Sequence, residues 1–107
     1  MVFNKYNGLN EEVVRLFALQ ILSSLNFLHK ENIIHCDIKP ENIVMKKWGK
    51  SGAKLVDFGT SCFEGKQIYE YLQSRYYRAP EVMFKTRYSF PIDMWSFGCL
   101  IAELKIG

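Results

Sequence analysis

The chain has 107 residues, a length that suits about one domain. With 49% hydrophobic and 23% charged residues, it has the composition of a globular protein rather than that of a disordered one. The net charge of +3 is too small, and the basic residues too scattered, to indicate a nucleic-acid partner. No apolar run approaches the ~20 residues that a membrane span needs.

The three cysteines, Cys36, Cys62 and Cys99, are odd in number and form no C-x-x-C pair. A disulfide framework is therefore not expected, and the spacing of Cys36 with His29 and His35 does not fit a zinc site. The N-terminus also lacks the pattern of a secretory signal. These features predict an intracellular protein, cytoplasmic or nuclear, in a reducing compartment.

A first helix is predicted from Asn10 to about Lys30. Asn10 is a favourable N-cap, and the acidic residues Glu11 and Glu12 are favourable in the first turn. Apolar residues then recur at helical spacing. They are Val14, Phe17, Ala18, Ile21, Leu25 and Leu28. The helix should therefore have one broad buried face.

Two short strands are expected in the middle of the chain. Residues 42–45 (NIVM) and 53–56 (AKLV) are mostly apolar, and the glycines of the linking residues 46–52 fit a hairpin loop. Before them, residues 32–35 (NIIH) are long enough only for a fragment of a strand. Residues 59–79 show no sustained period and are expected to form a long loop, which is usually functional or disordered.

A second helix should begin at Pro91, because proline is favoured in the first turn, and should continue to about residue 104. Its apolar residues point nearly all round, which is typical of a helix at the centre of a larger protein. Gly107 lies where a C-terminal cap is common. Together the elements predict an α+β fold that is mainly helical with a short β-hairpin.

The sequence HCDIKPEN, residues 35–42, carries the first chemical motif. A lone loop aspartate such as Asp37 is usually a turn or cap residue. Here a lysine follows two residues later and an asparagine, Asn42, five residues later, which is the pattern of a phosphoryl-transfer loop. Five fixed positions (His35, Asp37, Lys39, Pro40 and Asn42) coincide by chance roughly once in a few million starting points.

Two further motifs follow in a fixed order. DFG stands at Asp57–Gly59 and APE at Ala79–Glu81, and each is a weak signal alone. With the loop at 35–42 they make the chain resemble a eukaryotic protein kinase over nearly all of its length. The resemblance implies the C-terminal lobe of a kinase domain, with catalytic loop 35–42, activation segment 57–81 and a central helix at about 91–104.

Phosphoryl transfer explains these residue types. It needs a carboxylate near the attacking hydroxyl, which suits Asp37 as general base. It also needs Mg²⁺, which prefers oxygen ligands, and Asn42 and Asp57 are the candidates. The resemblance implies ATP as the phosphate donor and proteins as the substrates. It also implies that Lys39 reaches the transferred phosphate and that His35 is more structural than catalytic.

Asp93 has two interpretations. As the one acid early in the apolar helix, it could simply interact with the helix dipole. The kinase resemblance instead makes it an anchor for the backbone of the catalytic loop. The resemblance likewise gives Glu81 of the APE motif a role in structural support.

The stretch IYEYLQSRYYRAPEV resembles the dual-specificity tyrosine-regulated kinases, which have a pair of tyrosines at the positions of Tyr69 and Tyr71. HCDIKPEN also resembles that family. The homeodomain-interacting kinases are near neighbours, but they typically lack the first tyrosine and have a small residue in place of Cys36. The resemblance implies autophosphorylation at Tyr71. Because Cys36 replaces the arginine that many kinases have beside the catalytic aspartate, Arg75 and Arg78 are expected to bind this phosphate.

Neither a G-x-G-x-x-G loop nor a V-A-I-K strand occurs, so the N-terminal lobe of a kinase is expected to be absent. The sequence is then best interpreted as a piece of an active protein kinase that is inactive alone. Two alternatives are a non-catalytic kinase-like module that binds partners and a small-molecule phosphotransferase of related fold. The presence of Asp37, Asn42 and Asp57 disfavours the first, and the APE motif with the paired tyrosines disfavours the second.

Overall fold

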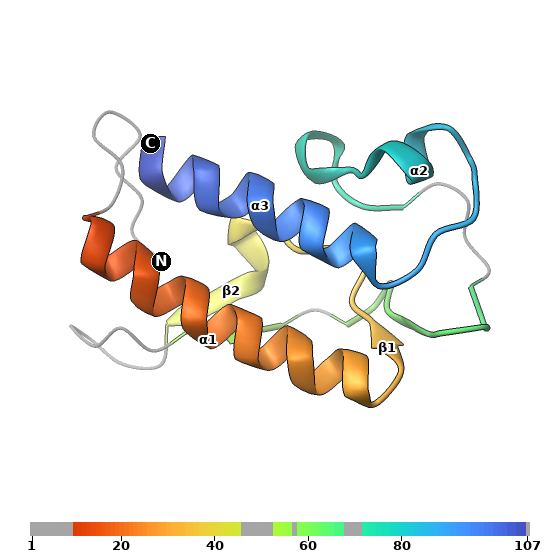
Figure 1. The fold of residues 1–107 in the computed structure, drawn as a ribbon, viewed down its shortest axis with the longest axis horizontal. Coiled ribbons are helices and arrows are strands. Elements are labelled where there is room, and N and C mark those ends of the chain that lie inside the picture. Colours follow the sequence, from red (N-terminus) through yellow and green to blue (C-terminus); the bar gives the residue numbers. More distant parts are fainter. Residues whose placement is uncertain (1–9, 46–52, 57, 68–71, 107) are drawn as a thin grey trace.

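A computed structural model describes residues 10–45, 53–56, 58–67 and 72–106. Two long helices, α1 (Glu11–Lys30) and α3 (Pro91–Ile106), lie side by side (Figure 1). Between the helices the chain forms short elements, in the order β1 (Ile33–Ile34), η1 (Pro40–Asn42), β2 (Ile43–Met45), β3 (Ala53–Leu55), β4 (Cys62–Phe63), η2 (Arg75–Tyr77) and α2 (Pro80–Met83). No helix in the described ranges is long and apolar enough to cross a membrane.

The first helix forms where the sequence predicts it. The Asn10 side chain accepts a hydrogen bond from the Glu12 backbone N–H at 2.8 Å, which satisfies one of the free donors of the first turn. The helix ends at Lys30, and Asn32 follows with a φ of 63°, a left-handed conformation that asparagine tolerates. The buried face consists of Val14, Phe17, Ile21, Leu25 and Leu28.

The strands form two separate antiparallel pairs. The predicted hairpin is present, with Ile43 opposite Leu55 in the β2–β3 pair. The fragment β1 pairs with β4, with Ile33 opposite Phe63. The prediction of an irregular stretch over 59–79 is therefore incomplete, because β4 and the 3₁₀ turn η2 lie within it. A two-residue strand is too short to show a period of its own.

The last helix begins at Pro91, as predicted, and ends at Ile106, two residues beyond the predicted end. One face of it is buried, and the rest is covered only in part by the residues described. The buried face consists of Ile92, Asp93, Ser96, Leu100 and Leu104, whereas Met94, Trp95 and Ile106 are exposed. Leu100 and Leu104 join the apolar face of α1 in the main core, together with Ile38 and Ile43. Because Ile38 belongs to this core, the loop 35–42 is packed against the two helices. Gly107 lies outside the described residues.

Candidate active site

The loop 35–42 is held to the start of α3 by one carboxylate. Asp93 Oδ2 accepts a hydrogen bond from the His35 backbone N–H at 2.8 Å, and Oδ1 accepts one from the Cys36 N–H at 3.0 Å. Cys36 has a φ of 74°, which is uncommon for a residue with a side chain. The bonds to Asp93 therefore fix a strained backbone directly before Asp37.

Asp93 is fully buried and has a third donor. His29 Nε2 lies 2.9 Å from Asp93 Oδ2, and the His29 ring packs against Phe90 with a centroid distance of 4.7 Å. A buried carboxylate is costly unless it is paired and hydrogen-bonded. Three donors from two segments meet this requirement here, and they join α1, the loop 35–42 and α3 at one point. No motif or spacing in the sequence predicts that His29 takes part.

His35 lies in the interior and bridges two backbone segments. Its Nδ1 accepts a hydrogen bond from the Asp37 N–H at 3.1 Å, so the proton is assigned to Nε2, which donates to the Val56 carbonyl at 3.0 Å. The Phe58 ring contacts the His35 ring edge-on, with a centroid distance of 5.0 Å. His35 thus connects the loop 35–42 to the end of the hairpin at Val56.

The Asp37 carboxylate is the centre of a polar cluster. Ser74 Oγ donates to Oδ1 at 2.9 Å, Asn42 Nδ2 donates to Oδ2 at 3.2 Å, and Lys39 Nζ lies 3.7 Å from Oδ2. Asp37 keeps 17% of its side-chain surface exposed. Its oxygens are therefore oriented by the protein and still reachable from solvent, as a catalytic base requires.

Asn42 is buried, and its amide is oriented by the same loop. Nδ2 donates to the Asp37 backbone carbonyl at 2.8 Å as well as to the carboxylate, so the amide oxygen is the atom left for a cation. The Asn42 carbonyl accepts from the Val56 N–H at 2.9 Å, which places the two ends of the hairpin together. Asp57, the other predicted metal ligand, lies outside the described residues.

The segment from Leu72 to Glu81 contacts the loop 35–42 through the hydrogen bond from Ser74 to Asp37. Arg78 Nε donates to the Leu72 carbonyl and Arg78 Nη2 to the Gln73 carbonyl, each at 3.0 Å. Arg75 is exposed, and its guanidinium lies 5.5 Å from the centroid of the Tyr76 ring. Arg78 is thus already bonded to backbone carbonyls.

Of the remaining predicted residues, Glu81 is described by the structure and Tyr71 is not. Glu81 is half-buried in α2, and its carbonyl accepts from the Thr86 N–H at 2.9 Å and from the Thr86 hydroxyl at 3.0 Å. Tyr71, the predicted phosphorylation site, lies outside the described residues, as does Tyr69.

The three cysteines are free thiols. Cys36 Sγ lies 3.9 Å from Cys62 Sγ, and Cys36 Sγ is 3.5 Å from the Ile34 carbonyl. Burial, and then the nearby Cys62 and Asp93, raise the pKa of the Cys36 thiol far above its ordinary value. Cys36 is therefore a neutral packing residue beside Asp37, and it adds no charge to the site.

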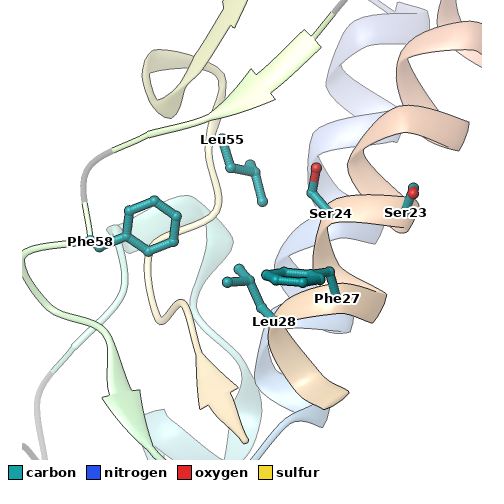
Figure 2. A pocket seen from close by; sticks show the side chains of 6 residues that line it. All are labelled: Ser23, Ser24, Phe27, Leu28, Leu55 and Phe58. Carbon is teal, nitrogen blue, oxygen red and sulfur yellow. The ribbon is translucent and has the colours of Figure 1, made fainter. Parts of the chain in front are cut away.

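An open apolar hollow of about 390 Å³ lies beside the site, between α1 and the residues that flank position 57. Figure 2 shows Phe58 on one side of it and Phe27 on the other, with Leu28 and Leu55 between them. Phe27 is 63% exposed and Phe58 46% exposed. The surface next to the DFG motif is therefore apolar and only partly covered by the residues described.

Comparison with known proteins agrees with this arrangement. The protein kinase domain family matches residues 2–107. The chain is 58% identical to the dual specificity tyrosine-phosphorylation-regulated kinase 3 of Homo sapiens over 104 residues, which cover 97% of this chain and 18% of that protein. It is 56% identical, over 97% of its length, to 11% of the probable serine/threonine-protein kinase dyrk2 of Dictyostelium discoideum. The chain thus spans less than a fifth of the length of these curated relatives.

A solved structure gives the same result for the fold. The crystal structure of the kinase domain of PF14_0431 superposes with a TM-score of 0.88 at 36% sequence identity. The superposition covers 94% of this chain and 36% of that one. The predicted fold, an α+β kinase-like lobe that is mainly helical with a short hairpin, is confirmed.

Proposed function

This chain belongs to the protein kinase family, and we propose that the protein containing it transfers the γ-phosphate of ATP to serine and threonine hydroxyls of protein substrates. The observation that carries this proposal is the environment of Asp37. Its carboxylate is bonded to Ser74, Asn42 and Lys39 and remains partly exposed. A carboxylate oriented in this way can hold an acceptor hydroxyl and accept its proton.

The Ser74 contact supports a hydroxyl acceptor. A serine hydroxyl of the chain itself donates to Asp37 Oδ1 at 2.9 Å, so the carboxylate is placed to accept a hydrogen bond from an alcohol. In transfer, the substrate hydroxyl would donate its proton to Asp37 while its oxygen attacks the γ-phosphorus, and the bond from that phosphorus to the bridging oxygen would break to release ADP. Lys39 Nζ, 3.7 Å from Oδ2, would stabilise the negative charge of the transferred phosphoryl group.

Mg²⁺ would be held by the amide oxygen of Asn42 together with Asp57. The donor set fits, because both ligands offer oxygen atoms and Asn42 directs its nitrogen toward Asp37. When bound, the metal ion would neutralise negative charge on the ATP phosphates. The chain's own contribution is to fix Asn42 through the hairpin contact with Val56.

We also propose that Tyr71 is phosphorylated by the protein itself. The support is the similarity to relatives whose names describe regulation by tyrosine phosphorylation, and the position of Tyr71 between the DFG and APE motifs. A phosphate there would add about −1.5 to −2 charges and would require cationic partners. Arg75, which is exposed, is the more available of the two predicted arginines.

Residues 1–107 alone are proposed to be inactive. They contain no G-x-G-x-x-G loop to cover the phosphates. The apolar hollow beside Phe58 would be covered by another part of the kinase domain. The chain would then contribute the base and the metal ligands, and the rest of the domain most contacts with the nucleotide.

The test is transfer of phosphate from ATP to a mixture of serine- and threonine-containing peptides by the full-length protein. Asp37→Asn should lower the transfer rate by ~10²–10⁴-fold with little change in nucleotide binding, because loss of a positioned base affects the chemical step. Glu12→Gln, a carboxylate-to-amide change at an exposed position of α1, is the control. If Asp37→Asn were as active as Glu12→Gln, the assignment of Asp37 as the base would be wrong.

A further inference from the structure

Gln73 is a buried polar residue to which sequence motifs assign no role. It is 8% exposed, and its side-chain amide is fully bonded. Nε2 donates to the Ile92 carbonyl at 3.0 Å and to Ser96 Oγ at 2.8 Å, and Oε1 accepts from the Ala79 N–H at 2.8 Å. Gln73 thus ties the segment before the APE motif to the first turns of α3.

The same residue holds an unusual backbone conformation. Gln73 has a φ of 68°, in the left-handed region that a residue with a side chain rarely adopts. Its carbonyl accepts from Arg78 Nη2 at 3.0 Å. Such a conformation costs of order 1–3 kcal/mol and persists where surrounding contacts impose it, commonly at functional sites. Here the contacts are the side-chain bonds of Gln73 and the arginine.

Ser96 extends this network across the segment. Its hydroxyl accepts from Gln73 Nε2 and donates to the Tyr77 carbonyl at 2.5 Å. The Tyr77 N–H in turn donates to the Ser74 carbonyl at 2.9 Å. Residues 73–79 are therefore fixed to α3 by a continuous set of buried hydrogen bonds.

This network determines the position of the next residue, Ser74. Ser74 follows the left-handed turn directly, and its hydroxyl reaches Asp37 Oδ1 at 2.9 Å. α3 therefore orients the Asp37 carboxylate through two connections. Asp93 of α3 holds the backbone of the loop 35–42, and the Ile92 carbonyl of α3 holds Gln73, which precedes Ser74. A hydrophobic residue at position 73 could fill the same space, but it could not hold this turn.

We propose that Gln73 is a positioning residue for phosphoryl transfer, which sets the place of the acceptor hydroxyl by holding Ser74 against Asp37. This inference depends on the proposed kinase function and deepens it. It concerns the acceptor side of the reaction and not the nucleotide side. Loss of the Gln73 amide should therefore affect transfer to a peptide more than it affects reaction of ATP with water, because a small water molecule can reach the phosphorus in several orientations whereas a peptide hydroxyl has to be held in one.

The experiment compares two activities of the full-length protein, phosphate transfer to a serine/threonine peptide mixture and ATP hydrolysis without peptide. Gln73→Met keeps the side-chain length and removes the hydrogen bonds. We expect peptide transfer to fall about 10–100-fold, since a 1 Å misplacement can cost ~10²-fold in rate. The KM for ATP should stay within twofold and ATP hydrolysis within threefold of the wild-type values.

Gln67→Met is the matched control. Gln67 lies in the same long segment, and its amide also forms hydrogen bonds, with the Tyr88 carbonyl at 2.9 Å and the Gly65 N–H at 2.6 Å. It does not adjoin the Ser74–Asp37 contact, so the ratio of the two activities should not change. If Gln73→Met lowered both activities by the same factor, or behaved like Gln67→Met, the inference would be wrong.

Ser96→Ala is a second, smaller change in case Gln73→Met does not fold. It removes one partner of Gln73 and should shift the ratio in the same direction, and an unshifted ratio would overturn the inference. The two proposals fail differently. A wild-type protein that phosphorylates no peptide refutes the kinase function. An active wild-type protein with an unchanged ratio in the variants refutes only the role of Gln73.

Discussion

Replacing Asp93 by asparagine tests how the catalytic loop is anchored. The carboxylate accepts from His35 and His29 at Oδ2 and from Cys36 at Oδ1. An amide has only one acceptor oxygen, so in either orientation its NH₂ group faces a buried donor. One unsatisfied buried donor costs ~1–3 kcal/mol, and the remaining bonds lose the strength that a charged acceptor gives.

These terms add to about 2–5 kcal/mol of lost stability. For a domain of 150–250 residues this corresponds to a melting temperature lower by roughly 5–15 °C. The alternative interpretation of Asp93, as a partner of the helix dipole only, predicts a loss of about 0.3–1 kcal/mol. The two interpretations therefore differ by several degrees, which thermal unfolding resolves.

The assay is calorimetric or fluorescence-detected unfolding of the full-length protein, with Glu12→Gln as the control. Glu12 also lies in the first turn of a helix, but it is exposed, so the change should shift the melting temperature little. Asp93→Asn should also slow phosphate transfer, because the backbone that carries Asp37 loosens. A melting temperature within about 3 °C of that of Glu12→Gln would refute the anchoring argument.

Three other predictions concern the metal, the activation segment and the isolated chain. Asp57→Ala should weaken Mg²⁺-dependent nucleotide binding, because a metal ligand is lost, whereas Asp37→Asn should not. Titration with a fluorescent nucleotide measures this difference, and identical effects of the two changes would contradict the division of roles. Tyr71→Phe should lower activity more than Tyr69→Phe, and mass spectrometry of the fully active protein should find phosphate on Tyr71. Purified residues 1–107 should transfer no phosphate and should self-associate in light-scattering measurements, because exposed apolar patches promote association. A monomer with a sharp cooperative melt would contradict the last expectation.

The parts of the fold that the sequence predicted have local causes. Asn10 caps α1, Pro91 begins α3, and apolar residues at helical spacing define the buried face of α1. The hairpin between Asn42 and Val56 also follows from neighbouring residues. In contrast, β4 forms only because its two residues meet β1, about 30 residues earlier in the chain.

The candidate site shows the same difference between residues that a local motif predicts and residues that only the packing brings together. Spacing within a short motif is enough to predict Asp37 and Asn42 as site residues. The residues that orient them lie far away in the sequence, since His29 is 64 residues from Asp93 and Ser74 is 37 residues from Asp37. Single hydrogen bonds across such separations leave no period or spacing to detect. They depend on how α1, α3 and the activation segment pack together.

Arg78 shows how this packing changes the interpretation of a sequence motif. The sequence alone predicts that Arg75 and Arg78 both bind a phosphate on Tyr71. In the structure, Arg78 donates to the carbonyls of Leu72 and Gln73, so its removal would release the strained turn before Ser74 whether or not Tyr71 is phosphorylated. Arg75 is exposed, and its guanidinium lies over the Tyr76 ring. Arg75→Ala is therefore the sharper probe of phosphate binding, whereas loss of activity in Arg78→Ala would report on the position of Ser74 relative to Asp37.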